Sequence, residues 1–269
     1  MFELFRMDLR RMWKERFLTI LPLSLIAVLG VSYALMSLVS DPFMLDAMAV
    51  QGADVVAQDF EEALQIRQYS VLQYLHTMLV NGGMWLMVVG CGTGVFCAGD
   101  YTRGAVKNIF PIFSRRWSYV AARAFSLLAM VLELAVAGFG FAVVLKPFSI
   151  FPTWGGTWLD WLQLFGTTIL LGWAFALCMF FFTTLVRSEG WMAVVALLLA
   201  VGFPATVISG VAGLLHLPPL GEYTLFACSQ RLTMTFQPEV YVPIILTCLG
   251  WGAAYLLLNT WLLEHRDAA

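Results

Sequence analysis

Residues 17–39 read FLTILPLSLIAVLGVSYALMSLV and contain no charged side chain. A helix of this length rises about 34 Å, which is enough to cross a hydrocarbon core about 30 Å thick. The apolar run of a secretory signal peptide is shorter, roughly 7–15 residues. We therefore interpret this segment as a retained membrane span.

Similar segments recur along the whole chain. Its 269 residues are 61% hydrophobic, 14% aromatic and only 12% charged, and the mean hydropathy is +0.82. Soluble domains carry about 25% charged residues, so a soluble globular protein is excluded. The sequence predicts an all-α membrane protein with one transmembrane domain over residues 1–269. The six predicted spans are 17–39, 78–98, 124–145, 161–186, 191–208 and 242–263.

The basic residues predict the orientation, because Lys and Arg collect in cytoplasmic segments. Six spans place both termini on one side, and most of the 15 Lys and Arg fall on that side. They are Arg6, Arg10, Arg11, Lys14, Arg16, Arg103, Lys107, Arg115, Arg116, Arg123, Arg187 and Arg266. The other side has Arg67, Lys146 and Arg231. We expect both termini in the cytoplasm.

The first 16 residues predict an amphipathic helix lying on the membrane surface before the first span. Its apolar face comprises Phe2, Phe5, Leu9, Met12 and Trp13, and its polar residues Glu3, Arg6, Arg10 and Lys14 lie away from that face.

Two external segments are unusual. Residues 40–77 are acidic and compatible with a helix from about 54 to 75, which favours either an extension of the second span or a solvated loop. Residues 209–241 are apolar but interrupted by Pro218, Pro219 and Pro238. Such a segment predicts a re-entrant or interface-dipping helical pair before the last span.

Catalytic and metal-binding patterns are not found in the sequence. No lysine stands in a Walker A motif, no histidines form an H-E-x-x-H pair, and the five cysteines show no metal-ligand spacing. We expect no cofactor in this chain and no enzymatic activity of its own. The net charge of -2 gives no reason to expect a nucleic-acid partner.

Three residues within the spans are candidates for special roles. Glu133 lies midway along the third predicted span, where a carboxyl group is either a functional site or a hydrogen-bonding partner of a neighbouring helix. Gly90 and Gly94 form a small-x-x-x-small face in the second span, which predicts close helix packing rather than a substrate site.

The connection 99–123, between the second and third spans, contains a short predicted helix. Asp100 and Thr102 are potential N-caps, and Pro111 would end the helix after Phe110. The helix would expose Lys107 beside apolar residues, a combination that suits docking to a soluble partner. Alternatively, its basic residues only fix the topology and contact anionic lipids. The apolar residues are Val106, Ile109 and Phe110.

This connection resembles the coupling loop of type-2 ABC exporter permeases, the class that includes lantibiotic-immunity and bacterial drug or peptide exporters. The matching positions are Asp100, Gly104, Lys107, Pro111, Ser114, Arg115 and Arg116. The layout of an amphipathic N-terminal helix, six spans and a broken external segment also resembles that family.

The resemblance implies a permease in a bacterial plasma membrane, paired with a second permease copy and with cytoplasmic ATPase subunits that bind ATP and Mg²⁺. The substrate would be amphipathic or lipophilic: a peptide, an antibiotic or a lipid-like molecule. The implied contacts with the ATPase are Asp100, Arg103, Gly104, Val106, Lys107, Ile109 and Phe110. Two alternatives stay open: a non-transporting accessory or sensor subunit that binds a peptide with its acidic loop, and an intramembrane enzyme.

Overall fold

The computed structural model describes residues 2–14, 16–50, 57–104, 116–216, 218 and 220–265, and these residues contain helices and no strand. The α-helices are α1 (Phe2–Lys14), α2 (Phe17–Val39), α3 (Pro42–Val50), α4 (Ala57–Arg67), α5 (Val71–Leu75), α6 (Met84–Thr102), α8 (Arg116–Leu145), α9 (Trp158–Val186), α10 (Glu189–Ala200), α11 (Phe203–Leu214), α12 (Leu225–Arg231) and α13 (Pro238–His265). A π-helix spans His76–Asn81, and 3₁₀ turns span Lys146–Phe148 and Leu220–Tyr223.

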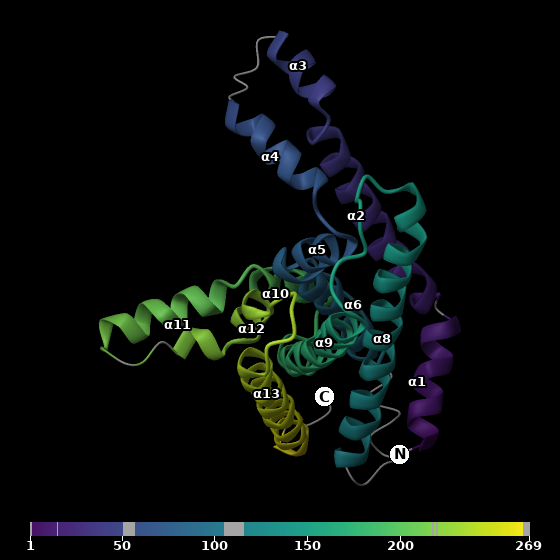
Figure 1. The fold of residues 1–269 in the computed structure, drawn as a ribbon. Helices are drawn as coiled ribbons and strands as arrows, with labels where there is room; N and C mark the ends of the chain where they lie inside the picture. Colours follow the sequence, from purple (N-terminus) through teal and green to yellow (C-terminus); the bar gives the residue numbers. More distant parts are fainter. Residues whose placement is uncertain are drawn as a thin grey trace.

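The core of the bundle forms around α6 and α9. Helix α6 packs against α9 and α10, α9 packs against α13, and α8 packs against α2 and α9 (Figure 1). A Cβ atom at Gly90 would lie 3.0 Å from the Cβ of Ala196, and one at Gly94 would lie 3.0 Å from the Cβ of Met192. These two glycines therefore let α6 and α10 approach closely.

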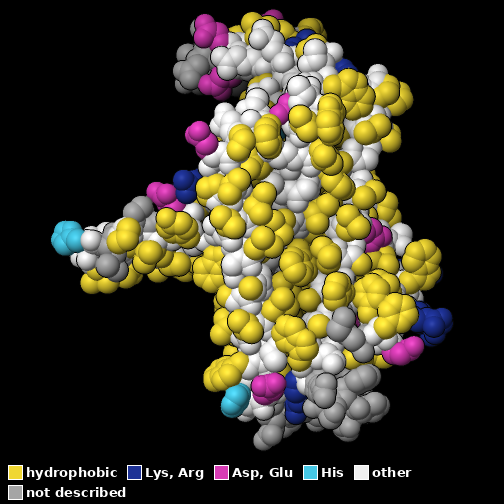
Figure 2. Space-filling view, turned by 60° about the horizontal axis from the view of Figure 1, so that its bottom comes forward, with side chains coloured by type: hydrophobic (Ala, Val, Ile, Leu, Met, Phe, Trp, Pro, Cys, Tyr) yellow, Lys and Arg dark blue, Asp and Glu magenta, His cyan; other side chains and the backbone are white. Residues whose placement is uncertain are grey.

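The all-α membrane class agrees with the structure. Among the described residues, five helices are long and apolar enough to cross a membrane: Phe17–Val39, Met84–Thr102, Arg116–Phe148 (α8 with the following 3₁₀ turn), Trp158–Val186 and Pro238–His265. Figure 2 shows hydrophobic side chains over most of the visible face of the bundle, with charged side chains mainly toward its ends. A surface of this kind suits a lipid environment.

The predicted continuous span 191–208 is wrong in its geometry. Helices α10 and α11 meet at a 55° bend across Val201 and Gly202. Gly202 has a φ of 79°, a conformation that glycine adopts without steric cost and that cannot continue a right-handed helix. Helix α11 therefore extends sideways from the bundle (Figure 1).

Other helix bounds also differ from the predicted ones. Helix α9 begins at Trp158, three residues early, since Thr157 and Asp160 form a capping box. Helix α6 begins only at Met84, after Gly83 with a φ of 68°. Helix α8 begins at Arg116 rather than at 124, in a charged segment that hydropathy assigns to the loop.

In the segment 40–77, helices α3 and α4 form a hairpin and α5 follows, instead of one helix over 54–75. Helices α3 and α4 project beyond the bundle (Figure 1). Arg67 closes the base of this hairpin: its Nε donates to the Ser40 carbonyl at 2.8 Å and its Nη2 lies 3.6 Å from Asp41 Oδ1. Ser70, the N-cap of α5, separates α5 from α4. Residues 51–56 lie outside the described part.

Candidate functional site

Helix α1 packs against α8 with a face that differs from the predicted apolar stripe. Leu4, Asp8 and Met12 are buried, whereas Phe2 and Trp13 are 73% and 79% exposed. Met12 of the predicted apolar face is buried in the protein, whereas Phe2 and Trp13 are open to a membrane surface, so the interfacial placement of this helix stays a prediction. The helix is rotated so that Asp8, an acidic residue, enters the protein interior.

Asp100 explains part of this rotation. It lies in the last turn of α6, is completely buried, and forms ion pairs with Arg11 of α1 and Arg123 of α8. The hydroxyl of Tyr119 also donates to Asp100 Oδ2 at 3.2 Å. Three helices thus converge on one carboxylate.

Arg123 carries the network from α6 to α1. It is completely buried, and its Nη1 lies 3.5 Å from Asp8 Oδ2, which also accepts a hydrogen bond of 3.1 Å from Ser126. The ring of Phe96 lies beneath both guanidinium groups, 5.2 Å from that of Arg11 and 4.6 Å from that of Arg123. Two carboxylates and two guanidinium groups make the cluster neutral, which makes their burial tolerable.

We call this cluster the loop base. It comprises Asp8, Arg11, Phe96, Asp100, Tyr119, Arg123 and Ser126. The name reflects its position, because α6 leads into the connection to α8 and both helices contribute to the cluster. Thr102 also donates to Glu189 of α10 at 2.9 Å, so a fourth helix meets the same end of the bundle.

The structure describes only three of the residues implied as ATPase contacts: Asp100, Arg103 and Gly104. Asp100 is not an exposed N-cap of a loop helix, because α6 continues to Thr102 and buries its carboxylate among cations. Arg103 is exposed. Gly104 has a φ of 69°, and a Cβ added to it would meet no atom within 4 Å. Val106, Lys107, Ile109 and Phe110 lie outside the described residues.

Glu133 is half-buried on α8, away from the loop base. Its Oε2 is shielded from solvent and has no hydrogen-bond partner among the described residues. The structure therefore shows no hydrogen bond from a neighbouring helix to this oxygen.

Sequence reasoning missed Asp8, Arg11, Tyr119 and Arg123 as members of one site. One signal was available in the sequence. Asp8 lies four residues after Leu4 and four residues before Met12, so this acidic side chain shares a helix face with two apolar ones. The partners of Asp8 could not be read in this way, since Ser126 lies 118 positions along the chain.

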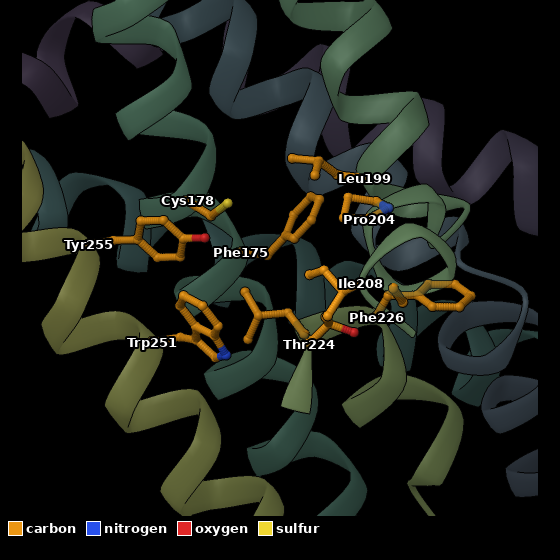
Figure 3. Close-up of a pocket in the computed structure, with 11 residues that line it drawn as sticks. Phe175, Cys178, Leu199, Pro204, Ile208, Thr224, Phe226, Trp251 and Tyr255 are labelled. Carbon is orange, nitrogen blue, oxygen red and sulfur yellow. The ribbon is translucent and has the colours of Figure 1, made fainter. Parts of the chain in front are cut away.

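The described residues contain no group of three or more His, Cys, Asp and Glu side chains that could hold a metal ion. These residues also form an apolar hollow between α9 and α13, which Figure 3 shows. Comparisons of the chain with protein-family models, with curated proteins and with solved structures found no match in any of the three.

Proposed function

We propose that the chain is the permease subunit of an ATP-driven exporter of the type-2 ABC class, with an amphipathic or lipophilic substrate. In this proposal the bent pair α10–α11 serves as the sixth membrane crossing. Both termini face the cytoplasm of a bacterial cell. ATP hydrolysis belongs to separate ATPase subunits, and a second permease copy completes the transport path.

The loop base is the observation that carries this proposal. Asp100 and Arg123 join the helices on the two sides of the connection 103–115, and Arg11 and Asp8 join α1 to the same pair. A force on the connection would therefore displace α1, α6 and α8 together. Such a rigid element can transmit a conformational change from a soluble motor to membrane helices.

The orientation can be tested separately from transport. In a variant without native cysteines, Leu64→Cys on α4 should react with an impermeant thiol reagent added to intact cells. Gly104→Cys should react only after the membrane is opened. Labelling of Gly104→Cys in intact cells would contradict the proposed topology.

The transport function is tested with the chain purified together with its ATPase partner and reconstituted in vesicles. Vanadate-sensitive flux of an amphipathic peptide is the expected result. Phe110→Asp should abolish ATPase assembly or uncouple hydrolysis from flux, because it places a charge in the proposed docking surface. Phe148→Asp is the matched control, since Phe148 is 82% exposed outside the connection 103–115. Wild-type flux in the Phe110→Asp complex would refute the coupling role.

The projecting α3–α4 hairpin favours a second candidate, an accessory or sensor subunit. Asp41, Asp46, Glu61 and Glu62 supply negative charge in this hairpin, and a cationic peptide would complement it. A chain that binds such a peptide but gives no vanadate-sensitive flux with any ATPase partner would support this alternative.

A further inference from the structure

Five side chains form one stripe along α13. Glu239, Pro243, Thr247, Trp251 and Tyr255 follow each other at intervals of four residues, so each lies next to the one before it on the surface of the helix. From the first to the last, the helix rises about 24 Å. Two hollows of different chemistry lie along this stripe.

The first hollow is apolar and lies toward the middle of α13. Its volume is about 110 Å³. Figure 3 shows Phe175 and Cys178 of α9 facing Trp251 and Tyr255 of α13, with the side chain of Ile208 from α11 between α13 and the α10–α11 bend. An apolar cavity of about 150 Å³ in another protein stays dry and binds benzene, so a hollow of this size accepts a few methylene groups.

Fixed contacts keep this hollow from collapsing. The bend at Gly202 sets α11 at 55° to α10, and the ring of Phe226 occupies the space beside Gly202. On the other side, Trp251 Nε1 donates to the Tyr223 carbonyl at 2.7 Å. Thr224 caps α12 by accepting a hydrogen bond of 3.3 Å from the backbone N–H of Ala227. The walls come from five helices, α9 to α13, and separate contacts hold them.

The second hollow is polar and lies nearer the start of α13. Its volume is about 240 Å³, and its walls include Glu222, Tyr223, Arg231, Glu239 and Thr247. Arg231 Nη1 lies 3.2 Å from Glu222 Oε2, and both side chains are more than half exposed. Two carboxylates against one guanidinium group leave this hollow with a net negative charge.

Ammonium groups match this second hollow. Carboxylates attract them, and the face of an aromatic ring stabilises them further. Tyr223 is 59% exposed and supplies such a ring beside Glu222. Arg231 already pairs with Glu222, so it adds no uncompensated positive charge.

We propose that the two hollows together bind one amphiphile with a single hydrocarbon chain and an ammonium headgroup. The headgroup lies beside Glu222, Tyr223 and Glu239, and the chain passes Thr247 to reach the apolar hollow at Trp251 and Tyr255. The linings of the two hollows are in direct contact, because Trp251 of the apolar hollow donates to the carbonyl of Tyr223 of the polar hollow. The assignment of this amphiphile as the transported substrate rests on the proposed function, whereas its binding does not.

Bulk lipid is the main competitor for such a site, so the experiment must separate saturable binding from partition. The purified full chain is reconstituted in phosphatidylglycerol vesicles, which contain no ammonium lipid. The probe is a dodecyltrimethylammonium with a photoreactive diazirine near the end of its chain, and mass spectrometry locates the adducts. Leu246 and Leu257, which are 63% and 66% exposed on α13, report the partition background.

Saturable adducts are expected on the side chains of the apolar hollow, and non-saturable ones on Leu246 and Leu257. At equal membrane-bound concentrations, which allow for the negative surface of the vesicles, unlabelled dodecyltrimethylammonium should compete at least roughly tenfold better than dodecyl sulfate, a factor that corresponds to 1.4 kcal/mol. Labelling of the hollow that rises with concentration in the same way as at Leu246 would overturn the site. Equal competition by dodecyl sulfate would overturn the headgroup assignment.

Matched variants test the two hollows separately. Ala205→Phe fills the apolar hollow and should lower saturable labelling roughly tenfold. Val207→Phe is the control: it adds the same ring to the same helix outside the lining of the hollow and should leave labelling unchanged. If Ala205→Phe does not fold, Ile208→Trp fills the same space from another position. Glu239→Gln should weaken binding of the ammonium probe, and Glu264→Gln at the other end of α13 should not.

Unchanged labelling in a folded filling variant would overturn the proposal. No nucleotide or partner subunit is needed for these measurements. A chain that binds the probe but transports nothing would refute the proposed function and leave the site in place. A chain that transports but shows no saturable labelling would refute the site and leave the proposed function in place.

Discussion

The loop base and the polar hollow on α13 both contain ion pairs, but they differ in burial. Arg123 and Asp100 are completely buried, whereas Arg231 and Glu222 have side-chain exposures of 56% and 52%. A buried charge that loses its partner has no water to replace it, so its contacts fix the arrangement of the helices. A half-exposed pair exchanges its contacts with water at little cost. The buried ion pairs of the loop base therefore hold the helices together, whereas the half-exposed pair in the polar hollow is available to a ligand.

Arg123→Ala should give the largest loss of stability. It removes the guanidinium group that pairs with both Asp8 and Asp100. Breaking a buried pair in this way costs about 3–5 kcal/mol. Thermal unfolding of the detergent-purified protein measures the effect. Arg231→Ala, the matched control at an exposed pair, should cost no more than about 1 kcal/mol. Equal losses in the two variants would contradict the distinction between the two regions.

Asp8→Asn should have the next largest effect. Asp8 accepts from Ser126 and lies 3.5 Å from Arg123, and hydrogen bonds to charged groups contribute about 1.5–3 kcal/mol. Helix α1 should then separate more readily from α8, which limited trypsin cleavage at Arg6 and Arg10 would report. Glu3→Gln changes an exposed side chain of the same helix and should leave the cleavage rate unchanged. Equal cleavage rates for Asp8→Asn and the wild type would argue against an anchoring role of Asp8.

Gly202→Ala tests the bend that shapes the apolar hollow. A Cβ at this position would lie 2.3 Å from the ring of Phe226, and the φ of 79° costs a residue with a side chain about 1–2 kcal/mol. A corresponding loss of thermal stability is expected. Gly210→Ala lies on α11 with no atom within 4 Å of its Cβ position and should change stability by less than about 1 kcal/mol. Similar effects of the two substitutions would show that the bend does not depend on Gly202.

His76 should give the smallest effect, visible as a dependence on pH. Burial lowers the pKa of the His76 imidazole below its usual value of 6.5, although its hydrogen bond to the Leu232 carbonyl acts in the opposite direction. The folded state therefore favours the neutral ring. Stability should be complete above about pH 6.5 and should fall as the pH decreases from there through the lowered pKa.

The thermal midpoint measured between pH 8 and pH 5 tests this prediction. His76→Gln should remove this component of the pH dependence, since glutamine does not titrate. A variant whose midpoint follows the same pH curve as the wild type would show that other groups cause the dependence.

Local sequence patterns located five helices that are long and apolar enough to cross a membrane, but not the 55° bend within the remaining predicted span. The uncharged run over 17–39 coincides with α2, because an apolar segment of this length satisfies its backbone hydrogen bonds as a helix in lipid. The small residues Gly90 and Gly94 lie against α10, as packing by close approach requires. The predicted end of α6 and the predicted start of α8 were less accurate. Asp100 and Arg123 form an ion pair between these helices, and a hydropathy profile does not register such a pair.

The sequence by itself determined that the chain consists mainly of apolar helices, that its basic residues are unevenly distributed and that prolines interrupt residues 209–241. These properties depend on neighbours within a few turns of helix, where side-chain periodicity acts directly. Only the tertiary structure decided which charges meet. Arg11 and Asp100 lie 89 positions apart, and their pairing requires α1, α6 and α8 to pack together first. The alignment of the two hollows along α13 has the same origin, because their walls come from helices that only folding brings side by side.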